Sequence, residues 1–236
     1  MEISDIFSDA LVYPFNNLKA LVLYLILGII LGIAIAGTLG AVMAGALANN
    51  ALAVIGSGII GIIIAFVIGF IITGYELDII TFGIERNNDA PGIDIVNQFI
   101  NGIKVFVVNI VYFIIPLIIA AILAVIFQHW LSVILTLVLF IVFGLAAFMG
   151  NCRLAKTHDL GYALDIGEAI GDISKVGIVQ LILFLVIVFV IAFVLYFIGG
   201  VLSNWNSTVG GIFTGIIGVY ITFFSSRAMG LLYSDV

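Results

Sequence analysis

Charged residues are scarce in this sequence, which also contains one cysteine and three prolines. Only 8% of the 236 residues are charged and 64% are hydrophobic, whereas soluble domains have about 25% charged residues. So few charges cannot cover the surface of a soluble protein of this size. The composition therefore excludes a soluble enzyme, a nucleic-acid-binding protein and a disordered chain. The single cysteine, Cys152, excludes a disulfide within the chain. An integral membrane protein remains.

The charges fall into four groups, separated by three uncharged stretches of about 50 residues each, Ala20–Tyr75, Val105–Cys152 and Val176–Ser226. Because a helix crosses a bilayer with about 20 apolar residues, each stretch has room for two crossings joined by a turn. A short polar or glycine-rich break lies inside each stretch, and the second break is Gln128-His129-Trp130. The predicted spans are 20–46, 52–76, 105–127, 131–152, 176–199 and 209–230.

The distribution of Lys and Arg predicts the orientation of these spans. All seven Lys and Arg residues lie in the segments on one side of the predicted hairpins, and the three hairpin turns contain none. Short loops that are rich in Lys and Arg remain in the cytoplasm. We therefore expect a multi-pass protein of the cell (plasma) membrane with both termini in the cytoplasm and no cleavable signal peptide.

A similar segment precedes each predicted hairpin: Asp9–Lys19, Asp94–Lys104 and Asp165–Lys175. Apolar residues in or beside these segments recur at helical spacing, which is typical of short amphipathic helices at a membrane surface. The fold class is therefore all-α, with six transmembrane helices in three hairpins, each preceded by a short cytoplasmic amphipathic helix. We expect one integral membrane domain over residues 1–236, built from hairpin units of about 1–75, 76–152 and 153–236. The three aspartates are interpreted as helix caps and solvated positions, with an acidic ring under the bundle as the alternative.

Several short motifs resemble a known family. They are Gly74-Tyr75, the segment Arg86–Pro91, then Gly102-Ile103-Lys104 with Tyr112 and Pro116, and finally Leu154-Ala155-Lys156 with Leu160–Asp165. This pattern resembles the multi-pass, mainly archaeal membrane family known as domain of unknown function 4013, over most of residues 11–178. The sequence departs from that pattern at Ala90, where the family usually has leucine. The resemblance implies a membrane location and transfers no activity or functional residue.

No Asp, Glu, Lys or Arg lies deep inside a predicted span, so hydrogen-bonding residues are the candidate sites there. Asn109 and Gln180 each lie five residues after the lysine of the preceding segment, and Tyr112 lies one turn beyond Asn109. We expect these three to form polar contacts between helices, as uncharged polar side chains do in membranes. Pro116 is a candidate helix kink because proline removes a backbone hydrogen bond.

Glycines mark the expected packing faces. Gly28 and Gly32 form a GxxxG pair in the first span, and Gly211 and Gly215 have the same spacing in the sixth. Small residues at this spacing let helix backbones approach one another in lipid. We therefore expect these four glycines to lie at helix contacts within the monomer, with a dimerisation face as the alternative.

The sequence contains no motif for a catalytic, cofactor-binding or metal site, and we expect a protein that is not an enzyme and has no cofactor. The first function hypothesis is a membrane scaffold or an assembly or envelope component, and the alternative is a transporter or channel-like permease for a neutral or apolar solute. The expected partners are the lipid bilayer and either another membrane protein or further copies of the chain, without nucleic acid. Glycosylation at the sequon Asn206-Ser207-Thr208 stays open.

Overall fold

The computed structural model describes residues 2–127 and 129–236, without the side chain of His129. The predicted turn Gln128-His129-Trp130 therefore lies partly outside the described residues. The helices in these ranges are α1 (Ile3–Asn16), α2 (Leu18–Leu47), α3 (Ala51–Ile84), α4 (Ile95–Ile126), α5 (His129–Thr157), α6 (Leu160–Ala163), α7 (Ile166–Val176), α8 (Ile178–Trp205) and α9 (Ser207–Tyr233).

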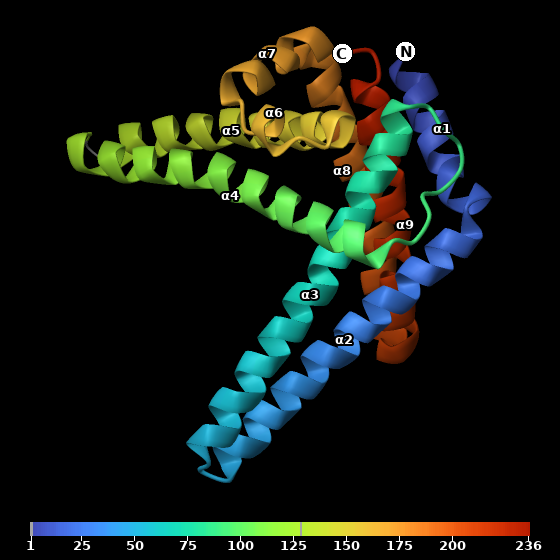
Figure 1. The fold of residues 1–236 in the computed structure, drawn as a ribbon, viewed down its shortest axis with the longest axis vertical. Helices are drawn as coiled ribbons and strands as arrows, with labels where there is room; N and C mark the ends of the chain where they lie inside the picture. Colours follow the sequence, from blue (N-terminus) through green and yellow to red (C-terminus); the bar gives the residue numbers. More distant parts are fainter. Residues whose placement is uncertain (1, 128) are drawn as a thin grey trace.

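Six of these helices are long and apolar enough to cross a membrane: α2, α3, α4, the part of α5 from Trp130, α8 and α9. The all-α prediction with six candidate spans is therefore confirmed. Consecutive long helices pack side by side as the pairs α2–α3, α4–α5 and α8–α9, and both chain termini lie at one end of the molecule (Figure 1). The far ends of the α2–α3 and α4–α5 pairs diverge in that view.

Side-chain caps set several helix starts. Asn50 accepts a hydrogen bond from the Ala53 amide at 3.1 Å, and Asp94 accepts one from the Asn97 amide at 3.1 Å. Asp165 caps α7 through the Glu168 amide at 3.1 Å. A capping carboxylate or amide satisfies backbone N–H groups that have no partner inside the helix. Asp94 and Asp165 thus act as helix caps, in agreement with the first of the two interpretations above, whereas Asp9 lies inside α1 and forms an ion pair.

The segment before the second hairpin differs from the prediction. α1 and α7 are separate short helices, but the segment Asp94–Lys104 caps and then continues directly into α4. Asp94 is the cap, and no glycine of positive φ and no proline interrupts the segment, so the helix starts ten residues earlier than the predicted span 105–127. The prediction of a separate amphipathic helix at this position is wrong.

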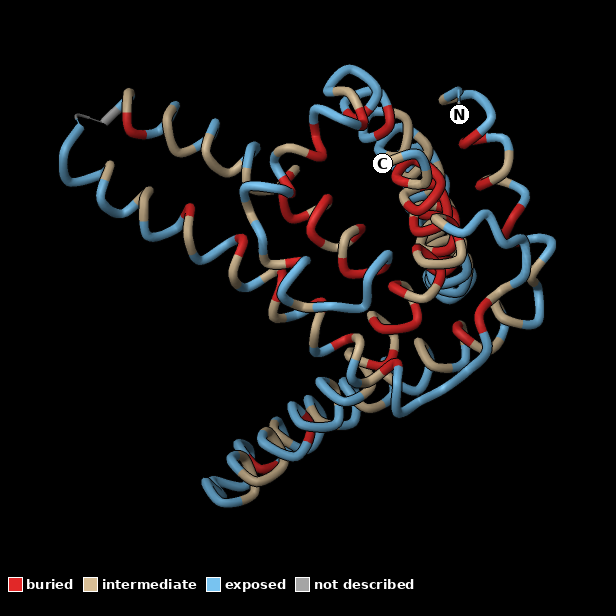
Figure 2. The backbone as a smooth tube through the Cα atoms, turned by 45° about the horizontal axis from the view of Figure 1, so that its top comes forward, coloured by how far each residue is buried: buried red, intermediate tan, exposed pale blue. Residues whose placement is uncertain are grey.

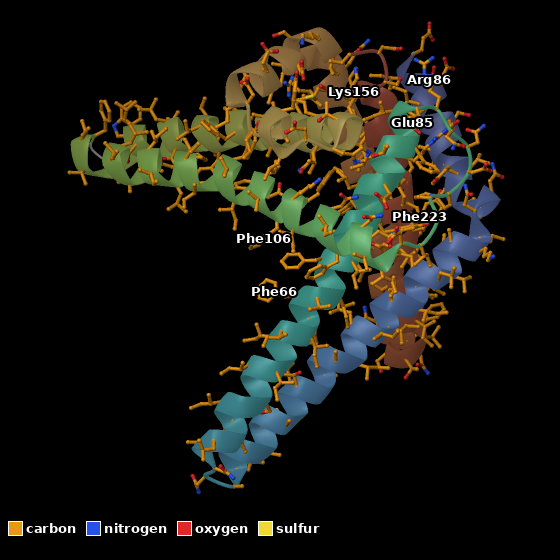
Figure 3. All side chains as sticks on the ribbon, in the orientation of Figure 1. Phe66, Glu85, Arg86, Phe106, Lys156 and Phe223 are labelled. Carbon is orange, nitrogen blue, oxygen red and sulfur yellow. The ribbon has the colours of Figure 1, made fainter. Side chains whose placement is uncertain are left out.

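The buried residues lie mainly where the helices meet, and the far ends of the hairpins are mostly exposed (Figure 2). α3 is the central element, because it contacts α2, α4, α5 and α9. The side chains of Phe66 on α3 and Phe106 on α4 meet edge to face, with ring centroids 6.3 Å apart (Figure 3).

Glycines allow α3 to approach its neighbours, but they are not the glycines that the spacing predicted. A Cβ on Gly74 would lie 1.8 Å from the backbone oxygen of Gln98, and one on Gly102 would lie 1.9 Å from that of Phe70. Gly83 and Gly230 form a similar contact between α3 and α9.

The four predicted packing glycines, Gly28, Gly32, Gly211 and Gly215, have no atom of the described chain within 4 Å of an added Cβ. Within the described residues, the expectation that they mediate contacts in the monomer is wrong. The GxxxG spacing places small residues on one helix face, but it does not determine which face meets a neighbouring helix.

Candidate functional site: a polar cavity between the long helices

A cavity of about 340 Å³ lies between five of the six long helices. We call it the Glu76 cavity. Its polar lining residues are Thr73 and Glu76 on α3, Asn109 on α4, Asn151 on α5, and Ser225 and Ser226 on α9. Its apolar lining residues are Leu77, Ile80, Val105, Phe148, Phe184, Leu185, Val188 and Met229. The cavity thus combines a carboxylate, two amides and three hydroxyls with apolar walls.

Glu76 supplies the only carboxylate of this lining. Tyr24 on α2 donates a hydrogen bond to Glu76 Oε1 at 2.5 Å, and the tyrosine ring is almost fully buried. Phe223 holds that ring in place through an edge-to-face contact with centroids 5.4 Å apart. The hydrogen bond occupies one carboxylate oxygen of Glu76. Among the described residues, no ion pair involves this carboxylate.

Two amide side chains, Asn109 and Asn151, also line the cavity. Asn151 donates a hydrogen bond from Nδ2 to Asn109 Oδ1 at 3.1 Å, which joins α5 to α4. The Oδ1 atom of Asn151 is buried, and no described residue donates to it. An acceptor without a donor in a buried position costs about 1–3 kcal/mol. The pair therefore has unused hydrogen-bonding capacity beside the cavity.

The sequence-predicted polar residues have different surroundings. Asn109 lines the Glu76 cavity, whereas Tyr112 is fully buried behind it and donates to the Ala163 carbonyl oxygen at 2.9 Å. Gln180 is exposed on the first turn of α8 and does not line the cavity, so the structure does not bring it together with Asn109. Pro116 is buried within α4.

A buried arginine lies at the same end of the bundle as the chain termini. Arg227 on α9 is 1% exposed and forms an ion pair with Asp9 of α1, with 2.8 Å between Nε and Oδ1. The guanidinium also donates to the carbonyl oxygen of Asn87 at 2.5 Å and to Asn88 Oδ1 at 2.8 Å. It lies 4.9 Å from the ring centroid of Tyr13, and burial raises the pKa of Tyr13 to about 12, although the guanidinium opposes that increase. Arg227 thus joins α1, α9 and the α3–α4 loop.

A second ionic cluster fastens α7. Asp172 is fully buried and accepts hydrogen bonds from Arg153 at 3.0 Å, Lys175 at 2.6 Å and Tyr233 at 2.5 Å. Burial alone raises the pKa of Asp172, but these three donors outweigh it, so the pKa is below its ordinary value. The hydrogen bond to Asp172 raises the pKa of Lys175. This cluster connects α5, α7 and the last turn of α9.

Sequence reasoning missed Glu76 because it ended the second span at residue 76, and it missed Asn151 although that residue lies inside the predicted span 131–152. The structure continues α3 to Ile84, so Glu76 lies two turns inside a helix that is long enough to cross a membrane. Thr73, Glu76, Leu77 and Ile80 have the spacing of one helix face, and this was the available signal. A charged residue was interpreted as the end of a helix, although charge alone does not end one.

The arrangement suits binding by hydrogen bonds and by charge. Carboxylate and amide oxygens accept hydrogen bonds, hydroxyls both donate and accept, and the apolar wall can cover the rest of a small molecule. Among the described residues, no three His, Cys, Asp or Glu side chains gather in a geometry that could hold a metal ion.

Comparison with known proteins places the fold in a family but gives no activity. No curated protein and no solved structure matches the chain. Residues 57–204 match the family described as "Protein of unknown function (DUF4013)". The match covers more than half of the chain and includes α4, α5 and most of α3 and α8, which supply most of the lining of the Glu76 cavity. The chain therefore belongs to this family, whose function is unknown.

Proposed function

We propose that the protein is a permease that binds a small solute in the Glu76 cavity on its way across the membrane. The observation that supports this is an ionisable side chain in a cavity between long apolar helices. Such side chains are costly inside a membrane and are found mainly at substrate and ion pathways. A purely neutral solute was expected because no charged residue lay deep inside a predicted span, but Glu76 lies within α3, so a charged solute also suits this cavity.

Flux through reconstituted protein tests the proposal. The purified protein is incorporated into phosphatidylcholine–phosphatidylglycerol liposomes, and swelling is followed after mixing with glycerol, urea or n-butylammonium chloride. We expect at least one of these solutes to enter faster than it enters empty liposomes. The double variant Asn109→Leu/Asn151→Leu should abolish the difference, whereas Gln180→Leu, an equivalent change outside the cavity, should not. Equal swelling with and without protein, or full flux in the double variant, would contradict the proposal.

We further propose a plasma-membrane location with both termini in the cytoplasm, no enzymatic activity and no nucleic-acid partner. The support for the orientation is that all seven Lys and Arg residues lie on one side of the predicted hairpins. Reporter fusions test it: green fluorescent protein should be active at the C-terminus, and alkaline phosphatase should be inactive there. Active phosphatase at the C-terminus would reverse the orientation.

A scaffold or assembly role is the second candidate. It is favoured by the helix face of α2 that carries Gly28 and Gly32, against which no neighbouring helix of the described chain packs. Gly28 and Gly32 on α2 meet no other part of the described chain, so this face is open to a second copy or another membrane protein. Single-molecule photobleaching of labelled protein in liposomes should then show more than one copy per complex. Gly28→Leu/Gly32→Leu should reduce that number, and an unchanged monomer in both cases would contradict self-assembly.

A further inference from the structure

The carboxylate of Glu76 has a cavity beside it, and no cationic side chain among the described residues forms an ion pair with it. Six of the seven Lys and Arg side chains have other partners: Arg227 pairs with Asp9, Arg153 and Lys175 with Asp172, Arg86 with Asp235, and Lys104 and Lys156 with carbonyl oxygens. Within the part of the chain that the structure describes, no ion pair links the seventh, Lys19, with Glu76, and Lys19 does not line the cavity. A carboxylate removed from water needs a compensating charge or a proton. A cation that enters the cavity would supply that charge.

The rest of the lining indicates the kind of cation. The polar groups other than Glu76 are amides and hydroxyls, and the buried Asn151 Oδ1 accepts no hydrogen bond from a described residue. A ligand that brings N–H donors satisfies these acceptors, and an ammonium group brings three. A bare metal cation would leave most of the remaining walls uncovered, because they are Leu, Ile, Val, Phe and Met side chains from five helices. Those walls suit the apolar body of an organic ligand.

We infer that the Glu76 cavity binds a small organic ammonium ion, with its N–H groups on Glu76 and the Asn109–Asn151 pair and its apolar body against α8. The inference rests on the proposed function and specifies its substrate class. The volume of about 340 Å³ is at the lower end of the range for small-molecule sites, so the ligand is small.

Calorimetric titration of the purified protein with matched probes tests the inference. The probes are n-butylammonium, n-butanol and sodium butyrate, which share an apolar body and differ in charge, and sodium chloride, which supplies a metal cation alone. We expect saturable binding of n-butylammonium, with affinity at least about ten-fold above that of n-butanol, because only the cation pairs with the carboxylate. Equal binding of the alcohol and the amine, or tighter binding of sodium, would overturn the inference.

Variants assign the binding to the cavity. Glu76→Gln keeps the size of the side chain and removes the charge, so it should weaken n-butylammonium binding at least about ten-fold and leave n-butanol binding unchanged. Glu85→Gln is the matched control, because Glu85 is an exposed glutamate at the end of the same helix (Figure 3). Where Glu76→Gln does not fold, Ser226→Leu narrows the cavity without touching the carboxylate and should also reduce binding. If either Glu76→Gln or Ser226→Leu folds and binds n-butylammonium as tightly as the wild-type protein, the ligand does not bind in the Glu76 cavity.

The outcomes for the permease and for the ligand class are distinguishable. Selective binding of n-butylammonium without flux into liposomes would support the ammonium site and contradict transport. Flux of glycerol or urea that depends on Asn109 and Asn151, together with unselective binding, would support the permease and contradict the ammonium site.

Discussion

Tyr233, which three further residues follow in the sequence, donates a hydrogen bond of 2.5 Å to the buried carboxylate of Asp172. Arg153 and Lys175 contact the same carboxylate, so one acidic side chain joins the last turn of α9 to α5 and α7. The cluster lies outside the Glu76 cavity. It holds α7 in place, and α7 is the short helix that directly precedes α8 in the chain. Its role is therefore structural support for a helix that lines the cavity.

Asp172→Asn should destabilise the protein by about 3 kcal/mol, because it leaves the mostly buried guanidinium of Arg153 without a counter-charge. Unfolding by sodium dodecyl sulfate in mixed micelles, followed by circular dichroism, measures the change. Glu168→Gln is the control, because its carboxylate is 59% exposed and lies 3.9 Å from Arg153. That variant should change stability by less than about 0.5 kcal/mol. Equal effects of the two variants would contradict the role given to Asp172.

The same cluster predicts a pH range of greatest stability. The pKa of Asp172 is lowered on folding, so its contribution is complete above the ordinary aspartate value of about 3.9 and is lost as the pH falls through the lower folded value. The pKa of Lys175 is raised, so its contribution is complete below about 10.4 and is lost as the pH rises through the higher folded value. The stability difference between the wild-type protein and Asp172→Asn should therefore be constant from about pH 5 to 9 and shrink in more acidic solution. If this stability difference instead grows as the pH falls below about 5, the predicted direction of the pH dependence is wrong.

Arg227→Lys should cost about 2 kcal/mol or more, although it keeps the charge. The guanidinium donates to Asp9, Asn88 and the Asn87 carbonyl oxygen at once, and a single ammonium cannot reach the same fork of acceptors. Detergent unfolding compares it with Arg86→Lys, in which both members of the ion pair with Asp235 are about half exposed. We expect less than about 0.5 kcal/mol for the control. If the two lysine variants lose equally little stability, the several hydrogen bonds of the Arg227 guanidinium do not stabilise the contact between α1, α9 and the α3–α4 loop.

Local patterns predicted the helices well and the contacts between helices poorly. Three uncharged stretches of the right length were enough for six spans, because a bilayer fixes the length of an apolar helix. The partner of Arg227 could not be predicted, because Asp9 is 218 residues away in the chain and no local pattern pairs them. The Glu76 cavity required five helices to be placed together, so the sequence yielded Asn109 but neither Asn151 nor the role of Glu76.

The crossing of α3 and α4 makes a sharp prediction about two glycines on one helix. In Gly74→Ala the new Cβ would lie 1.8 Å from the carbonyl oxygen of Gln98, which belongs to the backbone of α4 and cannot rotate away. The helices must separate, and we expect a loss of about 2–3 kcal/mol in stability, as for other overpacked contacts. Because Glu76 and Asn109 face the Glu76 cavity from these two helices, n-butylammonium binding should weaken as well.

Gly69→Ala is the matched control on the same helix, because, apart from the adjoining backbone of α3, no atom of the described residues lies within 4 Å of its added Cβ. Alanine is the better helix former, so this variant should be as stable as the wild-type protein or up to about 1 kcal/mol more stable. Detergent unfolding of the two variants, side by side, gives the comparison. Two alanine variants of equal stability would mean that α3 and α4 do not cross at Gly74, and the placement of Glu76 and Asn109 in one cavity would fail with that crossing.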